Sequence, residues 1–123
     1  MEYTMASLDT HHDLEVLLGR AARSDEAEDA TATAKPLPQV TAIYFTARWC
    51  TACKKLDIPS IQAAFPNVSW LKCDVDVNTY SPGFCGVRSI PSFMLIKNQK
   101  PTAAFTSSST EKVVAWIQGH LVN

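Results

Sequence analysis

The sequence predicts an α/β domain in which helices cover both faces of a central mixed β-sheet. Three runs of β-branched and aromatic residues, at 40–46, 68–75 and 92–97, have the composition of strands buried on both faces. Helical segments separate the early strands and favour parallel pairing, whereas the short turn at 98–101 predicts a late antiparallel hairpin. A chain of 123 residues fits one domain, which we predict to span 1–123.

The first part of the chain predicts a short extended piece at residues 2–6 and then an amphipathic helix. Apolar residues recur at helical spacing from Leu14 to Ala22, and either Asp9 or Thr10 can cap the helix start. The next segment, residues 24–35, is acidic and lacks any large apolar side chain. It buries too little area to offset the entropy of ordering, so we predict a mobile acidic insertion there.

The later connections are also predicted from local patterns. A helix follows the first strand as far as Phe65, kinked or divided by Pro59, and a short helix or turn covers 78–86. A fourth strand is expected at 102–106, and the capping-box spacing of Ser108–Glu111 predicts the start of a last helix. The inner face of that helix is formed by Val113, Val114, Trp116, Ile117 and Leu121.

The composition and net charge of the chain argue against several classes of protein. Hydrophobic residues make up 46% and charged residues 19%, which is typical of a folded domain. No apolar run approaches the roughly 20 residues that span a bilayer, and the N-terminus lacks the basic and apolar regions of a secretory signal. We therefore expect a cytoplasmic protein without a membrane partner. A net charge of −1, without a basic run interleaved with aromatics, argues against a nucleic-acid partner.

The charge is unevenly distributed. Residues 1–39 hold eight acidic and three basic side chains, whereas residues 40–123 hold four acidic and eight basic ones. One interpretation is that residues 40–123 form a mildly basic functional surface that favours acidic partners. The other is that the charged residues of both parts are ordinary solvated surface.

Two cysteines directly follow the first buried strand. At i,i+3 spacing, Cys50 and Cys53 place their sulfurs on the same side of a helix start, where unpaired N–H groups and the helix dipole stabilise a thiolate. Cys50, at the tip, can be exposed and attack a substrate disulfide, whereas Cys53 is shielded and resolves the mixed disulfide. The small Thr51 and Ala52 let a peptide approach closely. We therefore predict a redox-active pair, with a structural disulfide as the alternative.

The other cysteines do not complete a metal site. Zinc requires about four ligands, and the remaining Cys73 and Cys85 lack the C-x-x-C spacing, so we expect no metal. Cys73 lies within a strand, where a buried cysteine is usually an inert hydrophobic residue. Cys85 precedes Gly86 in a turn, and exposure there would make it a candidate regulatory thiol.

Three stretches together resemble the thioredoxin family. Residues 47–54 (ARWCTACK) resemble its active-site stretch, 72–76 (KCDVD) its central strand with an acidic end, and 86–93 (GVRSIPSF) the loop that ends in its cis-proline. The resemblance covers 40–121, in the family's order. It implies a thioredoxin fold and an enzyme that reduces or exchanges protein disulfides without a bound cofactor. It also implies that a thioredoxin reductase supplies electrons from NADPH.

The resemblance assigns roles to further residues. Trp49 would shield the thiols and contact the substrate, with a plain interface aromatic as the alternative. Pro91 would follow a cis peptide bond and face the sulfurs, and the backbone of Ile90 would pair with an extended substrate. Lys72 would lie beneath the site and favour a thiolate at Cys53, or else be an ordinary surface lysine.

Three departures from the family pattern bear on activity. Thr51 and Ala52 replace the family's Gly-Pro, and Tyr44 stands where the family has a buried aspartate that assists proton transfer. The family's glycine before the last helix, which lines the substrate groove, is replaced by residues 106–108 (TSS). A tyrosine is no equivalent base at neutral pH. Two alternatives to a reductase therefore stay open. The missing glycine and Tyr44 favour an interaction module or complex subunit with weak redox activity, and the Thr-Ala dipeptide favours an oxidase- or isomerase-like member.

Overall fold

The computed structural model describes residues 3–20 and 39–121. The insertion predicted at 24–35 lies outside these residues. The strands are β1 (Ala6–Ser7), β2 (Val40–Thr46), β3 (Ser69–Asp74), β4 (Ser92–Lys97), β5 (Lys100–Pro101) and β6 (Phe105–Thr106). The helices are α1 (His11–Leu17), the 3₁₀ helix η1 (Ala52–Lys55), α2 (Ile58–Ala64), α3 (Ser81–Phe84) and α4 (Thr110–Leu121).

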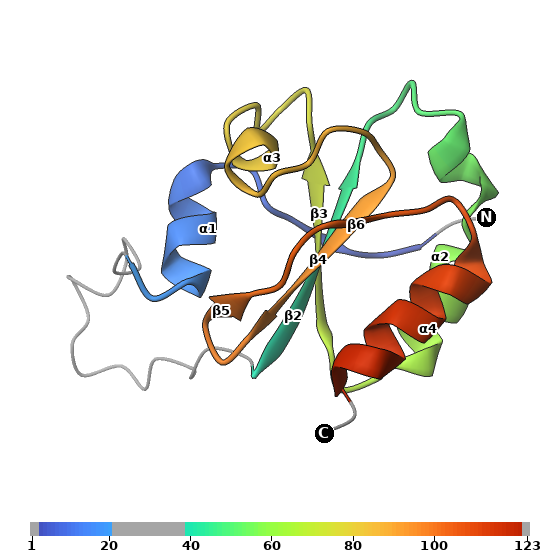
Figure 1. Ribbon diagram of the computed structural model, residues 1–123. Coiled ribbons are helices and arrows are strands. Elements are labelled where there is room, and N and C mark those ends of the chain that lie inside the picture. Colours follow the sequence, from blue (N-terminus) through green and yellow to red (C-terminus); the bar gives the residue numbers. More distant parts are fainter. Residues whose placement is uncertain (1–2, 21–38, 122–123) are drawn as a thin grey trace.

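β2 lies in the middle of a mixed sheet with the order β1-β3-β2-β4-β5, and β6 also pairs with β4 (Figure 1). It pairs in parallel with β3 and antiparallel with β4, while β1 pairs in parallel with β3. From Thr41 to Thr46 every residue of β2 is buried. The continuous apolar run therefore corresponds to a strand covered on both faces, as predicted.

Helices cover both faces of this sheet, with α1 and α3 on one side and α2 and α4 on the other (Figure 1). Successive side chains of a strand point to opposite faces, so Tyr44 joins one core cluster and Phe45 the other. The cluster of Tyr44 includes Ile61 of α2 and Ile117 of α4. The cluster of Phe45 includes Leu14 of α1. The predicted α/β class with helices on both faces is confirmed.

Replacing Ile117 by alanine tests the packing of α4. Ile117 has no exposed surface, so its truncation is expected to lower the free energy of unfolding by about 2–5 kcal/mol, measured by chemical denaturation. Gln118→Ala is the matched control, because Gln118 is exposed on the same helix and its change is expected to stay below about 0.5 kcal/mol. Equal effects in both variants would contradict this packing.

The first helix is shorter than its apolar periodicity predicts. It ends at Leu17, whereas the periodicity continued to Ala22, which lies outside the described residues. Gly19 adopts a φ of +75°, the left-handed conformation that commonly ends a helix. Of the two predicted caps, Thr10 is the one used, because its side chain accepts a hydrogen bond from the N–H of Asp13.

The helix predicted after the first strand is divided, but ahead of Pro59 rather than at it. Leu56 is extended, with a ψ of 139°, and separates η1 from α2. Asp57 then caps α2 by accepting a hydrogen bond from the N–H of Ser60. Pro59 falls in the first turn of α2, where its missing N–H costs no helical hydrogen bond.

Of the strand predicted at 102–106, only β6 (Phe105–Thr106) forms, and the turn predicted at 98–101 is shorter than expected because Lys100 and Pro101 form β5. Between the two strands, the hydroxyl of Thr102 accepts a hydrogen bond from the N–H of Leu95 at 3.1 Å. The turn before β5 is a two-residue hairpin with positive φ at Asn98 and Gln99.

The capping box predicted at Ser108–Glu111 is wrong by one residue. The hydroxyl of Ser109, not of Ser108, accepts the N–H of Lys112 at 3.3 Å. Lys112 thereby occupies the third helical position, where a capping box has Glu or Gln. Its ammonium group only donates hydrogen bonds, so it cannot accept one from the N–H of Ser109, and the reciprocal bond of a capping box is not formed.

Candidate functional site

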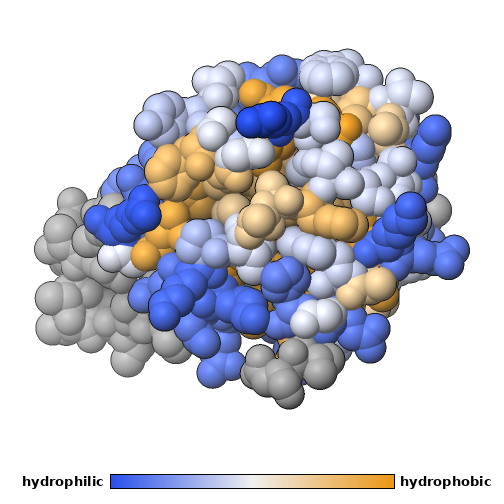
Figure 2. All heavy atoms as spheres, viewed as in Figure 1, coloured by the Kyte–Doolittle hydropathy of each residue, from blue (hydrophilic) through white to orange (hydrophobic). Residues whose placement is uncertain are grey.

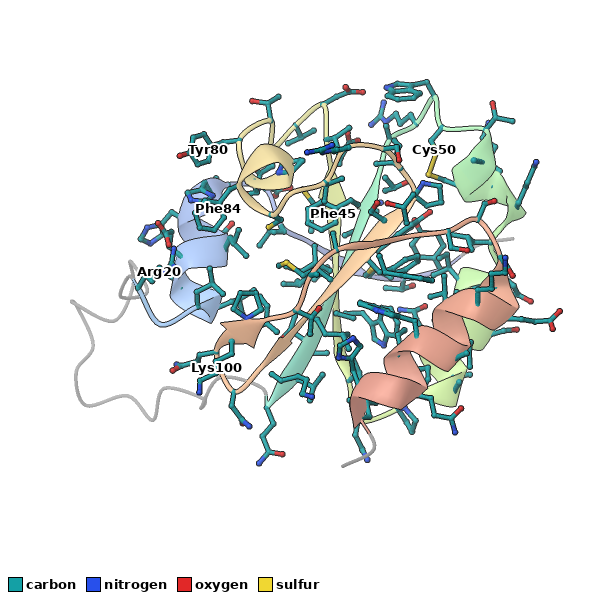
Figure 3. All side chains as sticks on the ribbon, viewed as in Figure 1. Arg20, Phe45, Cys50, Tyr80, Phe84 and Lys100 are labelled. Atoms are coloured by element: carbon teal, nitrogen blue, oxygen red, sulfur yellow. A yellow bond between two sulfur atoms is a disulfide. The ribbon has the colours of Figure 1, made fainter. Side chains whose placement is uncertain are left out.

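Cys50 and Cys53 are joined by a disulfide just beyond the C-terminal end of β2. Figure 3 shows this bond beside the label of Cys50, beyond the end of the central strand. The Cα atoms are 5.3 Å apart, and the backbone N–H of Cys53 donates to the Sγ atom of Cys50 at 3.1 Å. After reduction, this donor would stabilise a negative charge on Cys50. The geometry therefore favours Cys50 as the nucleophile.

The predicted difference in exposure between the two cysteines is wrong for this disulfide form. Cys50 is 3% exposed and Cys53 is 6% exposed. The bond turns the Cys50 sulfur toward Cys53, and both cysteines join the core cluster that contains Ala47. The two sulfurs differ through the N–H donor to Cys50 rather than through their contact with solvent.

A pocket of about 270 Å³, here called the inner pocket, lies beside the disulfide. It is lined by Tyr3, Tyr44, Thr46, Ala47, Arg48, Cys50, Cys53, Lys54, Leu56, Ile58 and Pro59. Tyr44 is buried, and its ring stacks on Phe93 with centroids 5.0 Å apart. Burial raises the pKa of the Tyr44 phenol above its ordinary value of 10, although a hydrogen bond with Thr46 partly opposes this. The inner pocket therefore places a neutral phenol, not a carboxylate, near the cysteines.

Lys72 lies beside Tyr44 in the parallel register of β3 and β2. Its Nζ atom is 5.7 Å from the ring centroid of Tyr3, a cation–π arrangement. Lys72 is half-buried and does not belong to the lining of the inner pocket. Its effect on a thiolate at Cys53 stays a prediction.

A second hollow of about 400 Å³, here called the outer groove, adjoins the cysteine loop through Trp49. Its lining consists of Trp49, Val75, Pro82, Val87, Arg88, Ser89 and Ile90. Trp49 is 65% exposed, and its indole N–H donates to a carboxylate oxygen of Asp76 at 2.8 Å. This hydrogen bond holds a large exposed aromatic ring at the edge of the groove.

The Ile90–Pro91 peptide bond is cis, as the resemblance implies. Pro91 is buried and precedes Ser92, which pairs with Phe45 near the end of β2. Pro91 therefore lies at the same end of the sheet as the disulfide. The two residues between the cysteines also lie near the surface, with Thr51 exposed and Ala52 half-buried.

Sequence reasoning missed Asp76, which binds Trp49 at the outer groove, and three residues that line this groove. Asp76 belongs to a stretch that we identified as a strand end, but its contact with Trp49 spans 27 positions and leaves no local signal. Val87, Arg88 and Ser89 precede the cis bond in the recognised loop. Their position beside Pro91 was the signal that could have identified them.

A cluster of aromatic side chains joins α1 to α3, where Figure 2 shows hydrophobic side chains on the surface. The ring of His11 makes edge contacts with Tyr80 and Phe84, at centroid distances of 4.4 and 4.9 Å. Its Nδ1 atom lies 3.0 Å from the hydroxyl of Ser81. These contacts hold α3 in place, and α3 contributes Pro82 to the outer groove.

The two free cysteines pack in the core cluster of Phe45 rather than in that of the disulfide, and burial raises both of their pKa values. The pKa of Cys73, fully buried in β3, is raised to about 12, and that of the half-buried Cys85 to about 11. Both thiols therefore keep their protons at neutral pH, and the thiolate is the reactive form. A regulatory role for Cys85 stays a prediction.

We expect neither free cysteine to be alkylated by iodoacetamide at pH 7 in the folded, oxidised protein. As pH is raised, Cys85 is expected to be modified before Cys73, because Cys85 is only half-buried whereas Cys73 has no exposed surface. Mass spectrometry of the digested protein measures both sites, with the protein unfolded in guanidinium as the control. Rapid alkylation of Cys85 at pH 7 would contradict this expectation and support a regulatory thiol.

Residues 3–20 and 39–121 contain no group of three or more His, Cys, Asp or Glu side chains that could hold a metal ion. The helices within the same ranges are all too short or too polar to cross a membrane.

Comparison with known proteins agrees with this geometry. Residues 28–119 match the family model Thioredoxin. A thioredoxin of Ophiophagus hannah is 27% identical over 81 residues, which cover 64% of this chain and 77% of that protein. A thioredoxin of Rickettsia typhi is 45% identical over 66 residues, which cover 49% of this chain and 62% of that protein. Oxidised mitochondrial thioredoxin 3 from Saccharomyces cerevisiae has the same fold, with a TM-score of 0.73, 20% identity and 94% coverage of both chains. The chain therefore belongs to the thioredoxin family, and its Cys50–Cys53 pair makes it a thiol–disulfide oxidoreductase.

Proposed function

We propose that the protein reduces disulfides of other proteins, with Cys50 as the attacking thiol and Cys53 as the resolving thiol. The Cys50 thiolate attacks one substrate sulfur and releases the other as a thiolate, forming a mixed disulfide. Cys53, after losing its proton, attacks the Sγ atom of Cys50, releases the second substrate thiolate and closes the Cys50–Cys53 disulfide. The N–H of Cys53 on the Cys50 sulfur is the observation that carries this assignment.

The outer groove is the proposed binding place for the substrate chain. Trp49 offers an exposed aromatic ring there, and Ile90 lies directly before the buried Pro91. Neither the N–H nor the C=O group of Ile90 forms a backbone hydrogen bond with a described residue. An extended substrate segment can therefore pair with them as an added strand. Thr51 and Ala52 would face the same segment.

The proposed electron source is a thioredoxin reductase that uses NADPH, and the proposed compartment is the cytoplasm. The test is reduction of insulin disulfides, followed by turbidity, first with dithiothreitol and then with NADPH and a thioredoxin reductase. Activity in both assays supports the proposal. Activity with dithiothreitol alone would replace the proposed reductase by another donor, and no activity in either would favour a docking module.

The replacement of Gly-Pro by Thr51 and Ala52 keeps an oxidase- or isomerase-like role as a second candidate. The reduction potential of the dithiol distinguishes the two roles, because a strong oxidant has a less negative potential than a reductase. Equilibration of the Cys50–Cys53 pair with glutathione buffers, read by mass spectrometry, measures this potential. A value near those of oxidases, about −120 mV, would replace the proposed reductase function.

A further inference from the structure

We propose that cations around the disulfide select protein substrates whose reactive cysteine is flanked by aspartate or glutamate. This inference rests on the proposed function and adds the class of substrate to it. Four exposed basic residues, here called the rim cations, carry it: Arg48, Lys54, Lys55 and Arg88.

Three of the four rim cations line one of the two hollows beside the disulfide. Arg48 and Lys54 line the inner pocket together with both cysteines, and Lys55 follows Lys54 in η1. Arg88 lines the outer groove, which is where the substrate segment is proposed to lie. A chain that occupies the groove therefore passes between positive charges of the cysteine loop and the positive charge of Arg88.

These positive charges are not neutralised by ion pairs with described acidic side chains. The ion pairs formed among the described residues join Glu15 to His11 and Arg20, far along the chain from the site. Asp76 is the acidic group tied to the groove, and it accepts the indole N–H of Trp49. Asp57 is used to cap α2. Asp57 keeps its negative charge in this role, and Asp74 pairs in register with Thr46 at the same end of the sheet. The described residues around the site thus present four cations against the three carboxylates of Asp57, Asp74 and Asp76, so their net charge is positive.

The reach of the electric field from these charges matches the spacing of an extended substrate. Residues in a strand are about 3.3 Å apart, and the Debye length is about 8 Å at physiological ionic strength. Side chains within two residues of the attacked cysteine therefore remain inside the field of the rim cations. Acidic side chains there are attracted and basic ones repelled, and such fields change association rates by about 10-fold or more. The effect acts on encounter and binding, before any sulfur–sulfur bond changes.

The test compares three disulfide peptides that differ only in having Glu, Gln or Lys on both sides of the cysteines. The pre-reduced full-length protein is mixed with each peptide, and the second-order rate of formation of the Cys50–Cys53 disulfide is measured. At low salt we expect the Glu peptide to react about 10-fold faster than the Lys peptide. At about 1 M salt, where the Debye length is about 3 Å, this ratio should fall close to one.

The double variant Arg48→Gln/Arg88→Gln separates the field from the intrinsic reactivity of the peptides. Its Glu-to-Lys rate ratio is expected to fall at least about threefold below that of the wild type, while Lys100→Gln leaves the ratio unchanged. Lys100 is the matched control because it is an exposed cation at the opposite end of the sheet from Cys50 (Figure 3).

Each outcome of this test is decisive. Reaction with the Gln peptide but equal rates with the Glu and Lys peptides would overturn the selection by charge and leave the proposed function intact. An equal loss of the ratio in Lys100→Gln would show that net charge, not the rim, is responsible, and would also overturn it. No reaction with any peptide would overturn both the proposed function and this inference.

Discussion

Cys50→Ser is expected to lower the rate of disulfide exchange by roughly 10³-fold or more, to the background of the assay. A serine hydroxyl keeps its proton at neutral pH and does not attack a disulfide as a thiolate does. Insulin reduction with dithiothreitol as the electron source measures this loss. Far-UV circular dichroism of the variant is the control for folding.

Cys53→Ser is expected to behave differently, and the difference tests the roles of the two thiols. The backbone N–H of residue 53 remains in this variant, so the donor that stabilises a charge on Cys50 is kept. Cys50 can still attack, but no second thiol releases the substrate, and a mixed disulfide accumulates. Mass spectrometry under non-reducing conditions detects this adduct. If Cys50→Ser trapped the substrate instead, the assignment of the roles would be wrong.

The core strands and the cysteine pair could be predicted because their signals are local. From Val40 to Thr46, an uninterrupted apolar and β-branched run specifies burial on both faces, and Cys50 and Cys53 stand directly after it. The composition of the strand indicates that it is buried on both faces. Because the cysteines come directly after the strand, the strand also determines at which end of the sheet they lie. The central part of the fold and the redox pair could therefore be read from consecutive residues.

The features that were predicted wrongly or missed depend on which of several similar adjacent residues is used, or on contacts between residues far apart in the sequence. Ser107, Ser108 and Ser109 all offer a capping hydroxyl, and which one is used depends on how the chain enters α4. Exposure of Cys50 depends on the direction in which the disulfide turns its sulfur. The contact between Trp49 and Asp76 joins the cysteine loop to the segment that follows β3. Such features arise from tertiary packing, which local propensities do not specify.

Tyr44→Asp is expected to accelerate the decay of the mixed disulfide at pH 7 by on the order of 10-fold or more. Cys53 must lose a proton before it attacks, and burial of this residue disfavours the charged thiolate. Tyr44 lines the same pocket, but burial raises the pKa of its phenol above 10, so the wild-type side chain cannot take the proton at neutral pH. Resolution in the wild type should therefore be slow at neutral pH and become faster as pH rises.

Tyr44→Asp is also expected to destabilise the fold, and this effect has to be separated from the effect on proton transfer. Tyr44 is 2% exposed and stacks on Phe93, so its replacement leaves a cavity and places a polar group in the core. A loss of about 3–5 kcal/mol in the free energy of unfolding is expected. Tyr44→Asn is the matched control, because asparagine has nearly the same size as aspartate but no basic carboxylate. Tyr44→Phe keeps the aromatic packing and removes only the hydroxyl.

Single-turnover kinetics of mixed-disulfide decay between pH 6 and pH 9 distinguish proton transfer from packing. If the missing carboxylate limits the wild type, Tyr44→Asp decays faster at pH 7 with a weaker dependence on pH, and Tyr44→Asn does not. Tyr44→Phe should follow the wild type across the range, because the phenol of Tyr44 stays protonated throughout it. Equal acceleration in the Asp and Asn variants would assign the effect to a loosened core that admits solvent. A decay that is independent of pH and identical in the wild type and Tyr44→Asp would show that solvent takes the Cys53 proton unaided, and Tyr44 would then serve only to fill space.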